Sequence, residues 1–167
     1  MLGALAVETR RVAFGPLVTR AGLRRPAGLR ALLDTVERIA PGRLIVGLGA
    51  GDSLSADENR AMGLPDETPA DRLAALEATL RALADAAYPV WVGGRSGPVR
   101  ARAARLADGW NGWNAPLDEF TSAVAHLAEA GVSAGRGEGA VVPTWGGLVE
   151  LRPPPSAAAS ALSLIHI

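Results

Sequence analysis

Two glycine-rich segments carry the residues whose types and spacing could bind a ligand. In the first, Gly47, Gly49 and Gly51 interrupt a leucine-rich and β-branched run that turns polar within 44–60. Glycine tolerates positive φ and lets the backbone approach a bound molecule closely. The segment therefore predicts a strand end that opens onto a binding site, although a plain strand-to-loop turn also needs small residues.

The second segment is the hexapeptide GGRSGP at 93–98. Pro98 suits the first turn of a helix, so the segment predicts a tight turn followed by a helix start. The amides of 94–97 would then point outward at a helix N-terminus, whose dipole favours an anion by roughly 0.3 to 1 kcal/mol. Arg95 could add a charge-assisted hydrogen bond. We interpret this segment as a phosphate site in preference to a turn alone.

Strand-like and helix-like segments alternate around these two motifs. The predicted strands are 12–18, 43–48, 88–92, 108–113 and 140–151, and the predicted helices are 26–40, 68–83, 99–107 and 117–130, with a loop at 131–140. Thr68 and Asp71 resemble a capping box at the start of the second helix. This alternation predicts an α/β fold with a parallel sheet and outer helices, either a βα barrel or a doubly wound sheet.

Apolar spacing assigns an inward face to each helix. The predicted inward residues are Leu29, Leu33, Val36 and Ile39 or Ala40; Leu73, Leu76, Leu80 and Leu83; Ala103 and Leu106; and Leu117, Phe120, Val124 and Leu127.

Composition excludes several function classes. The chain has 167 residues, of which 49% are hydrophobic and 20% charged, which predicts one globular domain. Seventeen basic and seventeen acidic residues cancel, and no basic run is interleaved with aromatics, so nucleic acid is not an expected partner. Cysteine is absent, and the two histidines, His126 and His166, are far apart, which leaves a metal site unsupported. No apolar run approaches the ~18 residues that span a bilayer, so we expect a cytoplasmic protein without a membrane partner.

A nucleotide-binding Rossmann fold, including methyltransferases that use S-adenosylmethionine, is one alternative for the first glycine motif. Such folds need an acidic residue that closes the next strand about 20 residues further on. Here 66–72 is a polar turn and helix start with no strand before it, so the required feature is missing.

The order of the motifs resembles a known family. The segments RVAFGPLVT, PGRLIVGLGAGDS, ENRAMGLP, YPVWVGGRSG, ARLADGWNGW and VVPTWGGLV are similar to the bacterial-luciferase-like superfamily of flavin- and deazaflavin-dependent oxidoreductases, from about residue 3 to residue 151. The resemblance implies a TIM (β/α)8 barrel with the cofactor across the carboxyl ends of the strands. The first strand here resembles the family's third and the last its seventh, so we expect a partial barrel with about five of eight βα units.

The resemblance also implies a function. A reduced flavin (FMN) or deazaflavin (coenzyme F420) would support oxygen insertion or hydride transfer on a small organic substrate, in an intact protein that could form a homodimer. The implied cofactor-binding residues are Val18, Thr19, Gly49, Gly51, Gly93, Gly94, Arg95, Ser96, Gly97, Asn111 and Gly112. Val18 and Thr19 lie where family members often carry a bulge with a strained peptide behind the flavin. No catalytic residue is assigned, because the family's acid–base residues come largely from the absent first quarter, and a non-catalytic barrel fragment is the remaining alternative.

The C-terminal tail is predicted to lie outside the fold. We place the barrel fragment at 1–152 and a non-native or disordered tail at 153–167, because three prolines begin that tail. The last six residues, LSLIHI, are the translation of CTGTCTCTTATACACATC, a transposon end used in sequencing libraries, so we expect 162–167 to derive from an adaptor.

Overall fold

Five parallel strands in sequential order form the main sheet of the molecule. The structure, a computed structural model, describes residues 1–53, 56–65, 67–151 and 163–166. The sheet runs β1-β2-β3-β4-β5, with bounds Thr19–Arg20, Val46–Gly49, Val90–Gly93, Gly109–Trp113 and Val142–Gly146. All four pairings are parallel, and β1 and β5 are the two edges, so the sheet is not closed. This confirms the partial barrel and contradicts the doubly wound alternative, whose strand order reverses.

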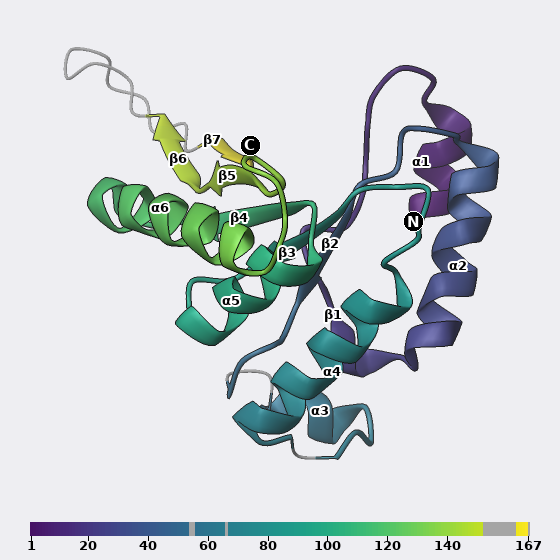
Figure 1. The fold of residues 1–167 in the computed structure, drawn as a ribbon. Coiled ribbons are helices and arrows are strands. Elements are labelled where there is room, and N and C mark those ends of the chain that lie inside the picture. Colours follow the sequence, from purple (N-terminus) through teal and green to yellow (C-terminus); the bar gives the residue numbers. More distant parts are fainter. Residues whose placement is uncertain (54–55, 66, 152–162, 167) are drawn as a thin grey trace, which may run out of the picture.

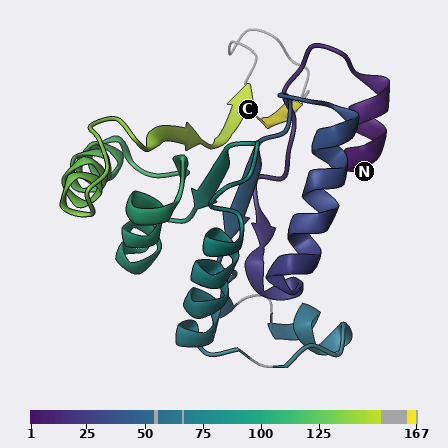
Figure 2. The same cartoon turned by 45° about the vertical axis from the view of Figure 1, so that its right-hand side comes forward.

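The helices lie along one side of this sheet (Figures 1 and 2). Their bounds are α1 Leu2–Glu8, α2 Pro26–Ile39, α3 Ala56–Ala61, α4 Pro69–Ala82, α5 Gly97–Leu106 and α6 Leu117–Ser133, with a 3₁₀ turn, η1, at Ala21–Leu23. We call the side that the helices cover the outer face of the sheet and the other side the inner face.

Alternate residues of the strands build the core on the outer face. Side chains in a strand alternate between the two faces, so a buried set appears at every second position. The core residues that the strands contribute are Val46, Leu48, Val90, Val92 and Trp110, each at most 3% exposed. They pack with leucines and alanines of α2, α4, α5 and α6 in one hydrophobic cluster.

Three predicted helix faces agree with the structure, and the fourth is partly wrong. In α2 the buried alternative is Ala40, whereas Ile39 is 49% exposed. The capping box at Thr68 and Asp71 is present, with both reciprocal hydrogen bonds. In α6, Leu117 is 80% exposed. Its buried residues are Ala123, Leu127 and Gly131, and Leu117 lies roughly 80° around the helix from the centre of that stripe at ~100° per residue.

Two segments differ from the predicted strands. Within 12–18 only Phe14 forms a bridge, to Leu44, and the strand proper is β1. The segment 140–151 divides into β5 and a second strand, β6 (Leu148–Leu151). Gly147 lies between the two strands, where a Cβ would be 2.2 Å from the Trp145 ring and only glycine fits.

Helical structure also extends beyond the prediction. Helices α1 and α3 were not predicted, and α6 continues to Ser133, inside the predicted loop. The C-terminal end of α1 is held by Arg43, which donates to the Ala6 carbonyl at 2.7 Å and to Thr9 Oγ1 at 2.8 Å. Because these partners are more than thirty residues away, local sequence patterns do not reveal them.

A separate two-stranded sheet follows the main one. Strand β7 (Ser163–His166) pairs antiparallel with β6. Residues 152–162 and 167 lie outside the described residues. The boundary at 152 and the adaptor origin of the last six residues therefore stay predictions.

Candidate functional site at the carboxyl edge of the sheet

The glycines of β2 make room for the chain segment 15–18. A side chain at Gly47 would place its Cβ 2.6 Å from the Pro16 carbonyl oxygen, and one at Gly15 would place it 1.5 Å from the Ile45 carbonyl oxygen. Backbone therefore lies against backbone here, closer than any Cβ permits. The close approach is fixed by the hydrogen bond from the Gly47 amide to the Pro16 carbonyl at 2.9 Å.

The pairing between this segment and β2 contains a bulge. Phe14 is opposite Leu44 and Thr19 is opposite Leu48, so five residue steps (14 to 19) face four (44 to 48). One extra residue in a strand bends it and changes the direction of a side chain. The peptide bond between Leu17 and Val18 is cis. An irregularity thus occurs where the family resemblance implies one.

Val18 lies on the inner face, over the ends of two strands. Its Cγ2 would be 2.6 Å from a Cβ at Gly49, and its Cγ1 would be 2.7 Å from a Cβ at Gly93. These glycines are paired with each other across β2 and β3. Val18 is nevertheless 44% exposed. Its isopropyl group therefore forms an apolar ledge, the Val18 ledge, with one side on glycine and the other open.

On the next two strands the inner face becomes polar and aromatic. Asn111 pairs with Gly93, is 4% exposed and donates from Nδ2 to Thr144 Oγ1 at 3.0 Å. Trp113, two residues further along β4, lies with its ring 3.1 Å from the position of a Cβ at Gly146 on β5. Trp113 is 42% exposed. The buried amide of Asn111 and the partly exposed indole of Trp113 therefore continue the surface that begins at the Val18 ledge.

The predicted phosphate segment is a turn between β3 and the N-terminus of α5. Gly94 has φ +135 and is held by β4 on both sides, since its amide donates to the Asn111 carbonyl at 3.3 Å and its carbonyl accepts from Trp110 Nε1 at 2.7 Å. Ser96 is the N-cap and makes no side-chain cap hydrogen bond. The prediction that four amides point outward is therefore wrong for Gly94, whose N–H is already used.

Arg95 is paired within the protein. Its Nε donates to Glu119 Oε1 at 2.9 Å, and its Nη2 forms an ion pair with Glu119 Oε2 at 2.5 Å. The hydrogen bond to Arg95 lowers the pKa of Glu119, and the same bond raises the pKa of Arg95. The Arg95 side chain is 45% exposed, so it can contact a further anion while Glu119 of α6 holds its position.

Three predicted site residues lie apart from this inner surface. Thr19 pairs with Leu48, an outer-face residue of β2. Gly51 has φ +80, and a Cβ there would be 2.4 Å from Arg20 Cδ. Gly112 faces α6, because its Cβ would meet the rings of Trp110 and Phe120 at 2.7 and 3.0 Å. The structure thus groups the Val18 ledge, Gly49, Gly93 and Asn111, with the 94–97 turn adjoining them. It adds Trp113, which was not among the predicted cofactor-binding residues.

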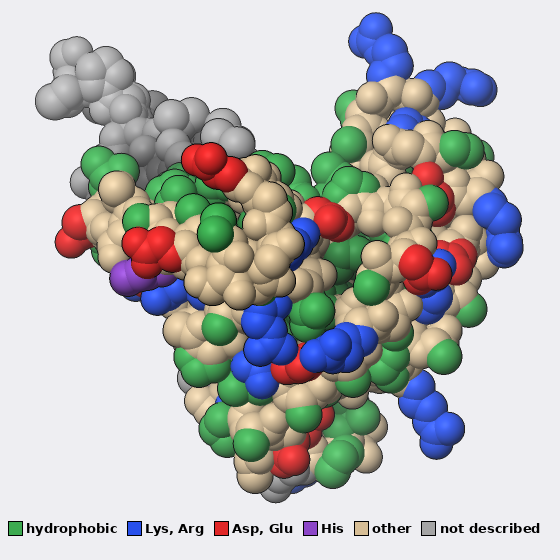
Figure 3. Space-filling model, viewed as in Figure 1, with side chains coloured by type: hydrophobic (Ala, Val, Ile, Leu, Met, Phe, Trp, Pro, Cys, Tyr) green, Lys and Arg blue, Asp and Glu red, His purple; other side chains and the backbone are tan. Residues whose placement is uncertain are grey.

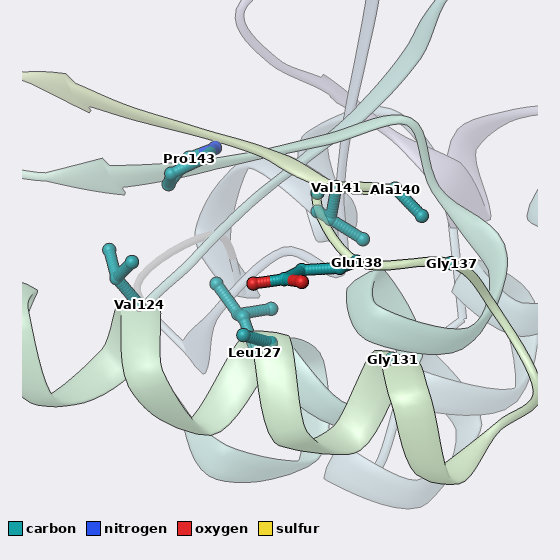
Figure 4. A pocket seen from close by; sticks show the side chains of 10 residues that line it. Val124, Leu127, Gly131, Gly137, Glu138, Ala140, Val141 and Pro143 are labelled. Atoms are coloured by element: carbon teal, nitrogen blue, oxygen red, sulfur yellow. The ribbon is translucent and has the colours of Figure 1, made fainter.

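The cavity shown in Figure 4 lies elsewhere, between α6 and the segment 137–143. It has a volume of about 240 Å³, and its lining is apolar, including Leu127 and Pro143, with Glu138 as the ionisable residue among its described residues. Ligand pockets usually measure roughly 300 to 1,000 Å³. A carboxylate would repel a phosphate, so this cavity does not fit a phosphorylated cofactor.

A polar pocket of about 300 Å³ lies beside the loop after β2 and includes Asp52, Asn59 and Arg72. The Asn59 Oδ1 atom is buried and has no hydrogen-bond partner among the described residues. His126 is exposed on α6. Within the described ranges no group of three His, Cys, Asp or Glu side chains could hold a metal ion, and no helix there is long and apolar enough to cross a bilayer.

Comparison with known proteins defines the class of this chain. The family model for luciferase-like monooxygenase matches residues 1–87 and 75–166. The chain therefore belongs to the luciferase-like monooxygenase family, as the motif order indicated.

The relatives that the chain resembles are named for different reactions. A 5,10-methylenetetrahydromethanopterin reductase of Archaeoglobus fulgidus is 26% identical over 131 residues, which cover 65% of this chain and 39% of the relative. The solved coenzyme F420 dependent tetrahydromethanopterin reductase of Methanopyrus kandleri is 22% identical, with 86% of this chain and 52% of that chain covered and a TM-score of 0.70. EDTA monooxygenase of Chelativorans sp. BNC1 is 14% identical, with 86% and 46% covered and a TM-score of 0.73. These structures show the shared fold, and the chain spans about half of their length.

Proposed function

We propose that the protein is a luciferase-like oxidoreductase that binds FMN or coenzyme F420 at the carboxyl edge of its sheet. The observation that carries the proposal is the Val18 ledge. Two paired glycines, Gly49 and Gly93, leave space for one valine whose other side is open. A flat apolar ring could lie on such a support without contacting the strands, and TIM-barrel sites are built at this edge.

The phosphate of the cofactor would lie at the turn 94–97. The start of α5 offers amide donors and the positive end of the helix dipole. Arg95 supplies a guanidinium that Glu119 orients toward the turn. Both cofactors carry a phosphate, so the residues present fit either one and do not choose between them.

Bound there, the reduced cofactor would supply the electrons for oxygen insertion or hydride transfer on a small organic substrate. The residues of this chain orient the ring, hold the phosphate and exclude water from the inner face. We assign no acid or base. The same proposal has three further parts. The protein acts in the cytoplasm, and the intact protein forms a homodimer. Residues 1–167 bind the cofactor more weakly than a chain extended at both ends.

Titration with FMN and with riboflavin, which lacks the phosphate, tests the proposal. The Arg95→Ala variant should bind FMN more weakly by roughly 1 to 3 kcal/mol, through loss of a charge-assisted bond, while its affinity for riboflavin should stay unchanged. A matched control is Arg105→Ala, because Arg105 is also 45% exposed and also pairs with a glutamate, Glu77. Arg81 and Arg102 pair with the same glutamate, and Figure 3 shows basic side chains gathered over α4 and α5.

The measurement is a dissociation constant for each flavin, repeated with coenzyme F420, on the 167-residue chain and on an extended chain. Failure of both chains to bind either cofactor would contradict the proposed function. An equal loss for Arg95→Ala and Arg105→Ala would contradict the phosphate position. A preference for one cofactor would decide between FMN and the deazaflavin.

A further inference from the structure

Trp113 lies on the same face of the sheet as the Val18 ledge. In a parallel sheet, paired residues point their side chains to the same side. Gly93, whose Cβ direction faces Val18, pairs with Asn111, and Trp113 follows Asn111 by two residues along β4. The Asn111 amide and the Trp113 ring both lie near the Cβ direction of Gly146. The valine and the indole therefore share one surface.

The two side chains stand over different pairs of strands. Val18 covers the ends of β2 and β3, and the Trp113 ring lies across β4 and β5. Neighbouring strands are roughly 4.8 Å apart, which separates the centres of these two pairs by about 10 Å across the sheet. The two residue steps from Asn111 to Trp113 add about 6.6 Å along the strand, so the two side chains lie about 12 Å apart. Asn111, which pairs with the Gly93 that Val18 covers, forms the floor between them, and its side chain is only 4% exposed. The inner face thus presents two apolar supports with a low strip between.

A tricyclic ring spans most of this distance, and the width of the indole covers the remainder. Three linearly fused six-membered rings extend about 10 Å when the van der Waals surface of the end atoms is included. A ring of that length, laid from the Val18 ledge across the strip, would end at the indole. Trp113 is 42% exposed in spite of its size, so part of its surface is accessible to a ligand on this face.

We propose that Trp113 contacts the ring system of the bound cofactor at the end opposite the Val18 ledge. This inference rests on the proposed function and adds a residue to it. The indole supplies apolar area and an aromatic face to one end of the isoalloxazine or deazaflavin. Asn111, held by Thr144, lies under the middle of the ring.

Trp145 offers a control on the neighbouring strand. It is 49% exposed, close to the value for Trp113, but it pairs with Gly112 and donates from Nε1 to the Ala115 carbonyl at 2.9 Å. Gly112 faces α6, so Trp145 lies on the outer face. A substitution there changes an equally exposed tryptophan of the same sheet without changing the inner face.

Riboflavin and FMN titrations of Trp113→Ala, Trp113→Phe and Trp145→Ala test the inference. Trp113→Ala should bind both flavins roughly three- to twelvefold more weakly than the unchanged chain, because it loses an aromatic contact. The ratio of the two affinities should not change, since the phosphate turn is untouched. Trp113→Phe should recover part of the loss. Emission of the bound flavin should increase in Trp113→Ala, because an indole in contact with the ring quenches it.

The outcomes separate the two proposals. If the unchanged chain and its extended form bind neither flavin, the proposed function is wrong, and so is the proposed contact between Trp113 and the cofactor ring. If flavin binds but Trp113→Ala matches Trp145→Ala in affinity and emission, the contact alone is wrong. Urea unfolding of each variant separates a binding loss from a folding loss, and the phenylalanine variant preserves the test if the alanine variant does not fold.

Discussion

The two faces of the sheet are built from alternate residues of the same strands, yet they differ in kind. On the outer face Val46, Leu48 and Val92 are fully buried under helices. On the inner face the same strands carry Gly47, Gly49 and Gly93, which support a neighbouring segment of backbone and one open valine. The outer face therefore supplies stability, and the inner face gives up side-chain burial to shape a surface. A substitution on the outer face should therefore change the free energy of unfolding, and a substitution of Val18 on the inner face should change ligand binding.

The largest expected effect is on stability, at the point where backbone meets backbone. Gly15→Ala should lower the free energy of unfolding by about 3 kcal/mol or more, because its Cβ would overlap the Ile45 carbonyl oxygen and force the segment off β2. Gly28→Ala is the control: it has open space within α2 and should be neutral or stabilising by up to about 1 kcal/mol. Urea denaturation measures both. Equal stability of the two variants would contradict the close approach.

A valine on each face separates stability from binding. Val92→Ala should cost roughly 1.5 to 3 kcal/mol of unfolding free energy, because Val92 is fully buried in the outer core. Val18→Ala should cost much less stability, since Val18 is half exposed, and should instead weaken flavin binding by lowering the ledge.

Urea unfolding and riboflavin titration of these two variants provide the test. The comparison of the faces would fail if Val18→Ala destabilised the fold as strongly as Val92→Ala and left the riboflavin affinity unchanged.

The smallest expected effect concerns pH and lies on the outer side. Tyr88 is 3% exposed, and its hydroxyl donates to Asp34 Oδ1 at 3.1 Å; burial first, and then this hydrogen bond, raise its pKa above the usual value. In the unfolded chain tyrosine ionises near pH 10, so the folded state keeps a proton that the unfolded state loses. Stability from Tyr88 is therefore present below about pH 10 and falls as pH rises above it.

Tyr88→Phe should remove this part of the alkaline decline. The chain contains one tyrosine, so the absorbance change on phenol ionisation at alkaline pH follows Tyr88 directly. Urea midpoints at pH 9 and pH 11 should fall less for the variant than for the unchanged chain. An identical fall in both would show that Tyr88 is not protected by the fold.

Much of the outer face could be predicted from sequence, because periodic apolar residues report local structure. The helices α2 and α4, the strands β2, β3 and β4 and the capping box at Thr68 all follow from spacing, caps and β-branched runs. The predicted inward face of α6 was wrong at Leu117, because the buried residues follow a line that moves around the helix and leaves Leu117 exposed. The family resemblance, and not periodicity, supplied the order of the strands within a barrel.

The inner face was less accessible to sequence reasoning, because its contacts join residues distant in the chain. The glycine pattern indicated a close approach, but it did not reveal that the partner is Val18. Val18 precedes Gly49 by 31 residues (18 to 49) and Gly93 by 75 residues (18 to 93). Gly112 was assigned to the cofactor since it follows a strand, yet strand alternation directs it toward α6. The pairing of Arg95 with Glu119 depends on how α6 returns beside the turn, which no local pattern encodes.

The shared space at Val18, Gly49 and Gly93 has an evolutionary consequence. Three positions, one just before β1 and two at the ends of β2 and β3, hold one side chain among them, so their sizes are coupled. A larger residue at 49 or 93 is tolerable only if position 18 becomes smaller, and a change at 18 alone alters the height of the ledge and leaves the strands in place. Drift at the two glycines should therefore be slow, while position 18 can vary, and substitutions that do enlarge 49 or 93 should be found together with glycine or alanine at 18.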